Sequence, residues 1–527
     1  MKKIQGIFFS VLSGILLWQA WPVSPWTPLI FIAWLPLLYT ADRVTGKLHF
    51  YWLSLTTMLV WNTCTTWWIW NSSEIGALSA IIPNSLLMTL PWWGYRIFKR
   101  KFGQRTGYVS LIIFWMSFEF LHLNWQLSWP WLTLGNVFAM HPDWVQWYAF
   151  TGTSGGTLWV LGVNLLIYSL VKNWRTTETR PKTGMVFVIA GLILLPILVS
   201  LSIKASIKSP DVAKNNVVIV QPNIDPYYEK FDYRTVSSQI QTLIRLSEEK
   251  LDSATRLVVW PETALSEPVW QSEVSSLIFY QPVFAFVQRH PGITLLTGIE
   301  TFKNYGPQKA TPTAQLNPRD HTYFDIFNAA VSIKAGQPLQ FYDKSKLVPG
   351  VESLPDFLLW MGPVFEKFGG TAGGFGRSKT SEVFKEPDNP YITAPIICYE
   401  SIYGEYVASY VRKGANILTI MTNDGWWGNT PGYRQHMEYA RLRAIETRRW
   451  VVRSANTGIS AVIDEKGAVL QTRPWDLATS FRAAVPTGTE ETFFVRYGDL
   501  LSRICLAAAG LLVFWNLFLL VKKRMGK

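Results

Sequence analysis

The chain has 527 residues, of which 49% are hydrophobic and 16% are charged. Soluble proteins carry roughly 25% charged residues, so this composition argues against an ordinary soluble enzyme. The 27 tryptophans point the same way, because tryptophan is enriched where a membrane meets water. A net charge of +13 fits either nucleic-acid binding or the cytoplasmic loops of a membrane protein, and the positions of the basic residues decide between the two.

Eight apolar runs follow one another along the chain, seven before a large polar block and one after it. Most approach the ~20 residues that cross a bilayer core as a helix. The runs cover residues 5–21, 27–41, 48–70, 76–98, 108–124, 156–171, 184–203 and 498–520. They predict a polytopic α-helical membrane domain over residues 1–203 with seven helices, and a C-terminal transmembrane helix over residues 498–520.

Basic residues gather directly after apolar runs, at 96–105, 172–182 and 522–527. If the N-terminus is cytoplasmic, all three clusters are cytoplasmic, and the opposite segments 71–75 and 125–155 contain no Lys or Arg. The positive-inside rule therefore predicts a multi-pass protein of a bacterial inner membrane, with both termini cytoplasmic and the polar block on the periplasmic face. Juxtamembrane charge of this kind argues against nucleic acid as a partner.

Short β-rich runs alternate with helical patterns between residues 215 and 485. The predicted strands are 216–221, 256–260, 294–298, 329–333, 392–397, 417–421 and 460–464, and the predicted helices are 233–252, 270–290, 401–413 and 434–449. This alternation predicts a layered α/β domain. The strands are apolar enough to be covered on both faces, which favours this class over a β-sandwich.

Three segments at or just past predicted strand ends carry residues suited to acyl transfer: Glu262 in Trp-Pro-Glu-Thr-Ala, Lys344 in Tyr-Asp-Lys-Ser-Lys-Leu-Val-Pro, and Cys398 in Ile-Cys-Tyr-Glu. Strand ends are where α/β proteins place catalytic groups. A carboxylate can take the proton of a thiol, and a lysine can stabilise the thiolate and the oxyanion that forms. Alone, each residue would more often be a loop glutamate, a surface lysine or a core cysteine, so the combination carries the prediction.

The combination resembles the nitrilase superfamily, whose members use a Glu-Lys-Cys triad on an α-β-β-α sandwich. The segments Asn423-Asp-Gly-Trp-Trp-Gly and Arg453-Ser-Ala-Asn-Thr-Gly are similar to two further signatures of that superfamily. Over its full length the chain resembles the membrane-embedded apolipoprotein N-acyltransferase branch, which has seven helices before this domain and one after it.

The resemblance implies transfer of an acyl chain from a membrane phospholipid to the N-terminal amino group of the diacylglyceryl cysteine of apolipoproteins. It implies that Glu262 is the general base, that Lys344 stabilises the oxyanion, and that Cys398 carries the acyl chain as a thioester in a ping-pong mechanism. The positions that match supporting or substrate-binding residues are Glu352, Tyr399, Glu400, Asn328 and Trp426. No cofactor and no metal are implied. The implied partners are phospholipid, diacylglyceryl lipoprotein and membrane lipid.

Two positions depart from the family pattern. The segment Pro349-Gly-Val-Glu lacks the phenylalanine of the usual Pro-Phe-Gly-Glu, and Phe231 stands where a tryptophan is common. Lys346 competes with Lys344 for the role of the lysine, and the spacing to Leu347 and Pro349 favours Lys344.

Two other functions stay open on the sequence. A membrane-tethered amidase would use the same triad with water as the acceptor, although eight helices are a large anchor for a soluble substrate. A transporter or receptor would only bind a ligand with its outer domain. It would be expected to carry charged residues within the membrane, but the apolar runs have few, of which Glu119 is the clearest example.

Overall fold

The structure is a computed structural model that describes residues 2–177, 183–208, 214–355, 358, 360, 362 and 374–525. The chain divides into two compact units. The first holds Met1–Trp67, Ala77–Lys204 and Tyr497–Lys527, and the second holds Trp68–Gly76 and Ala205–Arg496. The short segment Trp68–Gly76, which contains the predicted loop 71–75, is therefore part of the second unit.

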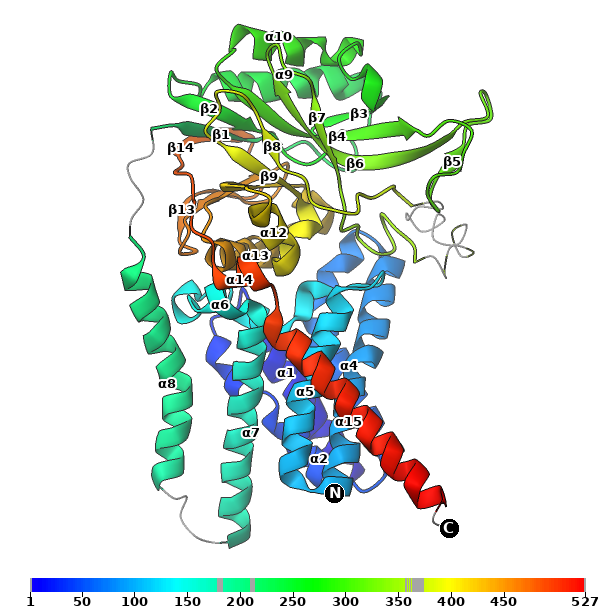
Figure 1. Cartoon of the computed structure of the whole chain (residues 1–527), viewed down its shortest axis with the longest axis vertical. Coiled ribbons are helices and arrows are strands. Elements are labelled where there is room, and N and C mark those ends of the chain that lie inside the picture. Colours follow the sequence, from blue (N-terminus) through cyan, green and yellow to red (C-terminus); the bar gives the residue numbers. More distant parts are fainter. Residues whose placement is uncertain are drawn as a thin grey trace. The chain divides into compact units, whose positions relative to one another are not determined.

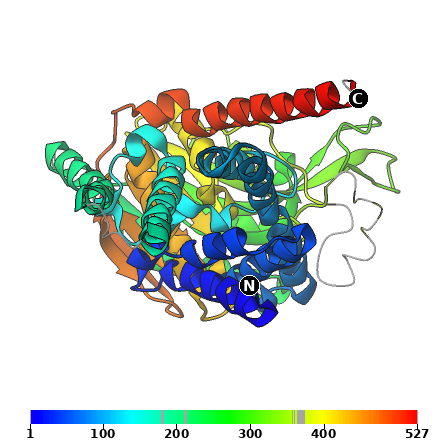
Figure 2. The same ribbon diagram turned by 90° about the horizontal axis from the view of Figure 1, so that it is seen from below.

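Helices build the first unit (Figure 1). They are α1 (Lys3–Ala20), α2 (Leu35–Arg43), α3 (Lys47–Thr66), α4 (Glu74–Phe102), α5 (Gln104–Leu123), α6 (Tyr148–Thr151), α7 (Thr153–Thr177), α8 (Thr183–Ser206) and α15 (Leu500–Met525). Within the described residues, six of them are long and apolar enough to cross a membrane: α1, α4, α5, α7, α8 and α15. Helix α1 packs along α3, and α15 packs along α5 (Figure 2).

The prediction of one helix over residues 27–41 is wrong. The chain forms a short 3-10 helix, η1 (Thr27–Phe31), followed by α2, whose 9 residues are too few to span a bilayer. A proline stands in the first turn of each element, where proline is tolerated. Helix α3 has 20 residues, but it is not among the six apolar helices. The predicted count of eight spanning helices is therefore not confirmed.

Tryptophan also forms the interior of the first unit, beyond the interfacial role expected from composition. The side chains of Trp34, Trp61, Trp92 and Trp115 are almost fully buried. The Trp34 ring lies 5.1 to 5.8 Å from the other three ring centroids. Such tilted and edge-to-face contacts stabilise aromatic cores beyond the area they bury.

Two β-sheets form the centre of the second unit. The eight-stranded sheet contains β1 (Asn216–Gln221), β2 (Thr255–Val259), β3 (Leu265–Trp270), β4 (Thr294–Asn304), β5 (Gln315–Leu316), β6 (Tyr323–Lys334), β7 (Gln340–Asp343) and β14 (Thr479–Ala484), with the core order β14-β1-β2-β4-β6-β5. The six-stranded sheet has the order β13 (Val469–Arg473), β12 (Ser460–Ile463), β11 (Val451–Ala455), β10 (Ile417–Thr422), β9 (Ile392–Ile397) and β8 (Phe384–Lys385). Strands β1, β2 and β4 are parallel, as are β9, β10 and β11.

Helices cover the outer face of each sheet (Figure 1). They are α9 (Val236–Glu248) and α10 (Gln281–Arg289) on the first sheet, and α12 (Gly404–Arg412) and α13 (Pro431–Thr447) on the second. Strand β1 shows how alternation builds the layers. Its Val218 packs in the cluster that contains Ile240 of α9, whereas its Ile219 packs in the cluster that contains Ile396 of β9. This is the predicted α-β-β-α sandwich.

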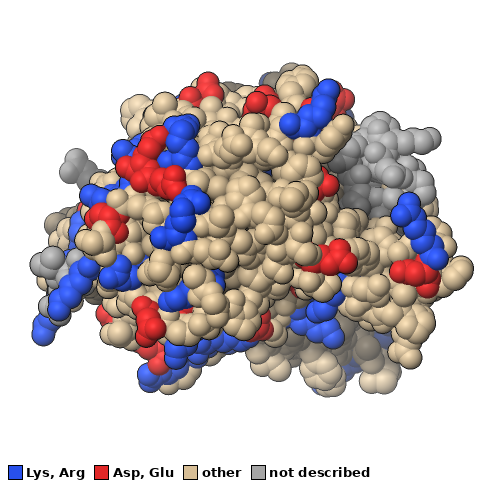
Figure 3. Space-filling view, turned by 90° about the horizontal axis from the view of Figure 1, so that it is seen from above, with Lys and Arg blue, Asp and Glu red and all other residues tan. Residues whose placement is uncertain are grey.

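The outer surface that carries α9 and α10 mixes charges of both signs (Figure 3). Ion pairs join Arg245 to Glu249 and Arg289 to Glu248 on these helices and beside them. Interspersed charge is typical of a solvated surface, whereas a nucleic-acid interface gathers basic residues on one face.

Candidate active site

Cys398 lies in a tight turn directly after β9, at the start of the 3-10 helix η10 (Cys398–Ile402). Its backbone φ is +50°, which few residues other than glycine adopt. Such strain persists only where surrounding contacts hold it, and it is frequent at active sites. The thiol-bearing residue is 8% exposed, so the turn keeps the sulfur largely away from water.

Glu262 follows β2 and is buried with three hydrogen-bond donors around its carboxylate. Oε1 accepts from Asn328 Nδ2 at 2.8 Å and from Lys344 Nζ at 3.1 Å. Oε2 accepts from the backbone N–H of Asn423 at 3.1 Å. These donors come from β6, from the end of β7 and from the end of β10, so strands of both sheets meet at this carboxylate.

Glycine at position 298 allows the Glu262 segment to lie this close to β4. A Cβ atom there would stand 2.4 Å from the Thr263 backbone nitrogen and 2.7 Å from the Glu262 Cα. Both are backbone atoms, which cannot swing aside as a side chain would. A close approach of two backbones therefore sets the position of the carboxylate.

Lys344 follows β7 and is 1% exposed. Its backbone N–H donates to the Asn328 carbonyl at 2.8 Å, and its Nζ donates to Glu352 Oε1 at 2.8 Å as well as to Glu262. Asn328 Nδ2 also reaches Glu352 Oε1, at 3.0 Å. A protonated lysine has three N–H groups, so one remains for a ligand beside these two carboxylates.

The competing lysine, Lys346, lies elsewhere. Its Nζ sits 5.2 Å from the ring centroid of Tyr403 and 5.5 Å from that of Tyr406. Cation–π contacts of this length hold the ammonium against the aromatic faces. The structure therefore brings Lys344, and not Lys346, to Glu262.

Burial and charge set the proton positions in the site. Burial raises the pKa of Glu262, but the Lys344 ammonium, the Asn328 amide and Lys230 outweigh it and hold this pKa below its usual range. Burial, then the Glu262 charge, raises the pKa of the Cys398 thiol, although Lys344 and a hydrogen bond with Thr422 oppose the rise. The resting site thus holds an ion pair and a neutral thiol. Burial and the Glu262 charge thus outweigh Lys344 and disfavour a preformed thiolate at Cys398.

Glu400 joins the turn that carries Cys398 to the segment that carries Lys344. Its Oε1 accepts from the backbone N–H of Ser345 at 2.7 Å and from the Tyr342 hydroxyl at 2.5 Å. Its Oε2 accepts from the backbone N–H of Ile397 at 2.9 Å. Burial raises the pKa of Glu400, and these donors oppose the rise. Tyr399 is also buried, with its ring 5.4 Å from that of Tyr403. These contacts support the turn that carries the nucleophile.

Trp426 lies in the 3-10 helix η11 (Asp424–Trp427) and is partly exposed. Its ring contacts those of Tyr227 at 5.2 Å and Phe231 at 6.2 Å, and its carbonyl accepts from the Tyr227 hydroxyl at 2.7 Å. Phe231, which stands where the family commonly has tryptophan, is 54% exposed and stacks on Trp426. Aromatic side chains therefore gather at this edge of the domain.

Two groups of buried residues that support the site were not singled out from the sequence. Asp424, which accepts from Thr422 at 2.9 Å and Arg453 at 2.7 Å, also bonds His436 Nδ1 at 2.9 Å. The other ring nitrogen of His436 lies 3.2 Å from the Cys398 carbonyl oxygen. The Asp424 and Arg453 segments were visible as family signatures, but His436 carries no local signal within its helix.

Lys230 is another buried residue of the site that the sequence does not single out. It is 2% exposed, and its Nζ donates to the Glu262 carbonyl oxygen at 2.8 Å. Burial lowers its pKa to about 8, although Glu262 and Cys398 oppose that fall. In the sequence Lys230 sits among tyrosines and acidic residues and is indistinguishable from a surface lysine.

Comparison with known proteins gives matches to family models, to relatives over most of the chain and to solved structures. Residues 216–490 match the carbon-nitrogen hydrolase family, and residues 13–166 match the apolipoprotein N-acyltransferase N-terminal domain. The apolipoprotein N-acyltransferase of Chlorobaculum tepidum is 31% identical over 519 residues, which cover 96% of this chain and 95% of that protein. The one from Geobacter metallireducens is 26% identical and covers 95% and 93%. The solved structure of Saccharomyces cerevisiae Nit3, from the nitrilase superfamily, is 17% identical and covers 53% and 93%, with a TM-score of 0.35.

The α-β-β-α sandwich and the match over residues 216–490 define the class of the second unit as a carbon-nitrogen hydrolase domain, in which Glu262, Lys344 and Cys398 follow strands β2, β7 and β9. In this chain that domain is joined to a unit of apolar helices. The chain belongs to the apolipoprotein N-acyltransferase family.

Proposed function

We propose that this enzyme transfers an acyl chain from a membrane phospholipid to the N-terminal amino group of the diacylglyceryl cysteine of an apolipoprotein. The observation that carries the proposal is the buried Cys398, held at a strained φ within the electrostatic reach of the Glu262–Lys344 ion pair. Family membership supports the reaction class. Glu262 is the proposed general base, Lys344 the oxyanion stabiliser, and Cys398 the nucleophile.

The first half-reaction forms a thioester. Cys398 Sγ attacks the ester carbonyl of the phospholipid while its proton passes to the Glu262 carboxylate. The third N–H of Lys344 donates to the oxyanion of the tetrahedral intermediate. The ester C–O bond then breaks, and Glu262 returns the proton to the departing oxygen, which leaves as the hydroxyl of a lysophospholipid.

The second half-reaction forms the amide. The amino group of the acceptor, as a free amine, attacks the thioester carbonyl, and Glu262 takes a proton from its nitrogen. The C–S bond breaks, and the sulfur regains the proton to restore the resting thiol. Holding the acyl chain on Cys398 lets two bulky lipids use one site in turn.

Glu352, Asn328 and Glu400 serve as positioning residues in this proposal, because their contacts run to Lys344, to Glu262 and to the nucleophile turn. Tyr399 supports the same turn. The aromatic edge at Trp426 and Phe231 offers an apolar surface suited to an acyl chain. The reaction as proposed uses no cofactor and no metal.

The same proposal puts the chain in the inner membrane of a bacterium, with both termini in the cytoplasm and the sandwich in the periplasm. The basic clusters beside the apolar helices support this orientation. It also gives both lipid substrates a common location, since phospholipid and diacylglyceryl lipoprotein are held in the same bilayer.

The test is incubation of the purified chain with phospholipid and a diacylglyceryl peptide, followed by mass spectrometry. We expect triacylated peptide, together with an acyl thioester on Cys398 when the peptide is left out. Cys398→Ser should lose both products by at least ~10³-fold, in line with the loss of a catalytic nucleophile, whereas Cys505→Ser, in helix α15, is the matched control. Fatty acid released without peptide acylation would instead indicate an amidase-like hydrolase. Full biological activity of Cys398→Ser would indicate a binding protein.

A further inference from the structure

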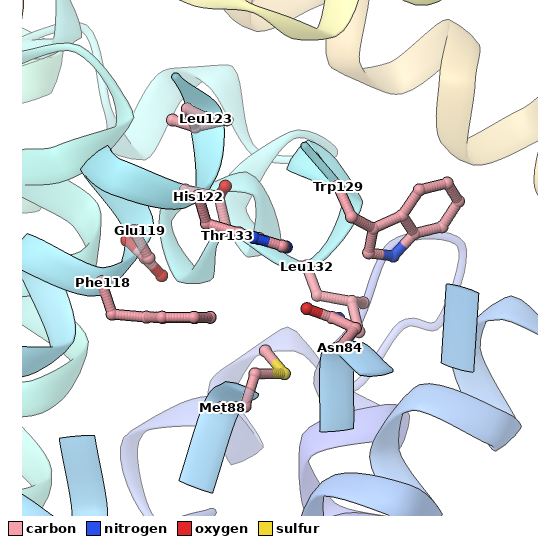
Figure 4. A pocket seen from close by; sticks show the side chains of 9 residues that line it. All are labelled: Asn84, Met88, Phe118, Glu119, His122, Leu123, Trp129, Leu132 and Thr133. Atoms are coloured by element: carbon pink, nitrogen blue, oxygen red, sulfur yellow. The ribbon is translucent and has the colours of Figure 1, made fainter. Parts of the chain in front are cut away.

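A small pocket in the first unit lies between α4, α5 and the connection that follows α5 (Figure 4). Its volume of about 10 Å³ is close to the smallest space that holds one water-sized oxygen. Met88, Phe118 and Leu132 form apolar parts of its wall. Polar atoms buried in such a wall are costly unless something bonds to them.

His122 presents an N–H group to this pocket. Its Nδ1 accepts from Trp125 Nε1 at 2.9 Å, so the proton of the neutral ring is on Nε2. The ring stacks on Phe118 with centroids 5.2 Å apart, which fixes its orientation. The residue is 8% exposed, and within the described residues no hydrogen-bond partner reaches Nε2.

Asn84 presents a carbonyl oxygen to the same pocket, and its orientation follows from its neighbours. Asn62 Nδ2 donates to the Met58 carbonyl at 2.9 Å, so Asn62 turns its oxygen toward Asn84. Asn84 must then offer its NH₂ group there, which it does at 2.7 Å. Its own oxygen is left on the opposite side, buried at 4% exposure and without a partner among the described residues.

Glu119 also lines the pocket, but neutral donors already surround its carboxylate. It accepts from Trp115 Nε1 at 2.9 Å, from the Leu134 backbone N–H at 2.8 Å and from the Thr157 hydroxyl at 2.7 Å. Among the described residues, His122 Nε2 and Asn84 Oδ1 are therefore a donor and an acceptor on this wall without a hydrogen-bond partner. Their side chains face each other across the pocket in Figure 4.

We propose that this pocket binds one hydroxyl oxygen, which accepts from His122 Nε2–H and donates to Asn84 Oδ1. A single O–H group is the smallest ligand that satisfies a donor and an acceptor at once. It can come from water or from the alcohol of a lipid headgroup, because the pocket lies near the end of a membrane-length helix, beside Trp125 and Trp129, and tryptophan is enriched where a membrane meets water. This site is distinct from the proposed acyl-transfer site and does not depend on that reaction.

The direct test is cryo-electron microscopy of the full chain in nanodiscs of either phosphatidylglycerol, whose glycerol headgroup has hydroxyls, or phosphatidylcholine, which has none. An isolated peak between His122 and Asn84 in both lipids identifies bound water. Density continuous with a headgroup in phosphatidylglycerol alone identifies a lipid hydroxyl. Both outcomes support the site, and an empty pocket in both lipids overturns it.

Thermal unfolding gives an independent measure through His122→Phe, Asn84→Leu and the double variant. If one hydroxyl bridges the two groups, each single variant should lower the Tm by about 2–4 °C. The double variant should then lower it by clearly less than the sum, because the first change already releases the hydroxyl. The Asn84–Asn62 bond is lost in both variants that carry Asn84→Leu, and the His122–Trp125 bond in both that carry His122→Phe, so each loss cancels in this comparison. Asn124→Leu, at an exposed position outside the pocket, is the control. An additive loss, or a rise in Tm on either substitution, overturns the proposal.

Discussion

Glu262 and Glu119 are buried glutamates, one in each unit, and each accepts three hydrogen bonds. The donors differ in charge. Glu119 meets an indole, a backbone amide and a hydroxyl, which are all neutral. Glu262 meets a backbone amide, a side-chain amide and the Lys344 ammonium. The two sites thus bury the same side chain in two ways.

The difference separates a structural carboxylate from one suited to chemistry. At Glu119 the three donors hold α5, the following connection and α7 together, and an amide could take the place of the carboxylate. In the proposed reaction the charge of Glu262 itself matters, because a paired carboxylate and ammonium beside a thiol can exchange a proton and stabilise an oxyanion. Isosteric substitutions that remove only the charge should therefore affect the two sites very differently.

The largest expected effect is that of Glu262→Gln on thioester formation. A glutamine cannot accept the thiol proton, so we expect the rate to fall by about 10³-fold, within the range for loss of a general base. The measurement is single-turnover acylation of Cys398 by phospholipid, followed by intact-protein mass spectrometry. Glu249→Gln, whose carboxylate pairs with Arg245 on the surface, is the matched control. Acylation of Glu262→Gln at nearly the wild-type rate would remove Glu262 from the proposed chemistry.

A smaller loss of acylation rate is expected when Glu262 is displaced but keeps its charge. In Gly298→Ala the added Cβ would stand 2.4 Å from a backbone nitrogen, so the Glu262 segment must move. A displacement of about 1 Å at a reacting group costs on the order of 10²-fold, and we expect a loss of 10- to 100-fold in acylation rate. Gly292→Ala is the control, because nothing lies within 4 Å of its Cβ position. Equal rates for the two variants would contradict this role of Gly298.

The sequence predicted the sandwich well and the helical unit less well. Strands β1 and β9 have the predicted limits, because dense β-branched runs leave little choice of conformation. Strands β13 and β14 were not predicted, because β13 is partly exposed and mixed in polarity and β14 is also polar. The run at 27–41 is not one helix, because hydropathy records apolar character and not where an element begins, and a proline stands at the start of each of its two elements.

In the candidate site, too, residues in local motifs are predictable from the sequence, whereas residues that act only through tertiary contacts are not. Glu262, Lys344 and Cys398 were predicted from local motifs, and their catalytic roles stay predictions. Lys230 and His436 were not predicted, since each acts across more than 30 residues of sequence, on Glu262 and on the Cys398 carbonyl. Those contacts form only in the folded protein, and no local spacing in the sequence indicates them.

A third prediction concerns the charge balance around Glu262. Lys230 is one of the groups that lower the pKa of Glu262, so Lys230→Met should raise that pKa and move the acid limb of the acylation rate to higher pH. Because the Glu262 carbonyl also loses a bond, we expect the rate at neutral pH to fall about tenfold, as for loss of one buried charged hydrogen bond. Lys250→Met, at an exposed position, is the control.

The same variant makes a prediction about stability. Lys230 has a folded pKa of about 8 and an unfolded value of 10.5, so the unfolded chain binds more protons between these values. Stability from this residue should therefore rise as the pH increases from about 8 to 10.5, and the Met variant should lack that rise. Thermal unfolding across this range measures it. If Lys230→Met changed neither the acid limb of the acylation rate nor the pH dependence of stability between about pH 8 and 10.5, Lys230 would have no electrostatic role at Glu262.

The smallest effect is expected for Glu119→Gln. The glutamine oxygen can accept from Trp115 and Leu134, and its NH₂ can donate to the Thr157 hydroxyl, which rotates to become the acceptor. We therefore expect a Tm within about 2 °C of the wild type, equivalent to less than ~1 kcal/mol. Glu119→Leu leaves the Trp115 and Leu134 N–H groups buried without partners, at about 1–3 kcal/mol each, and should lower the Tm by several degrees more. If Gln destabilises as much as Leu, the negative charge of Glu119 is itself required, and the contrast with Glu262 does not hold.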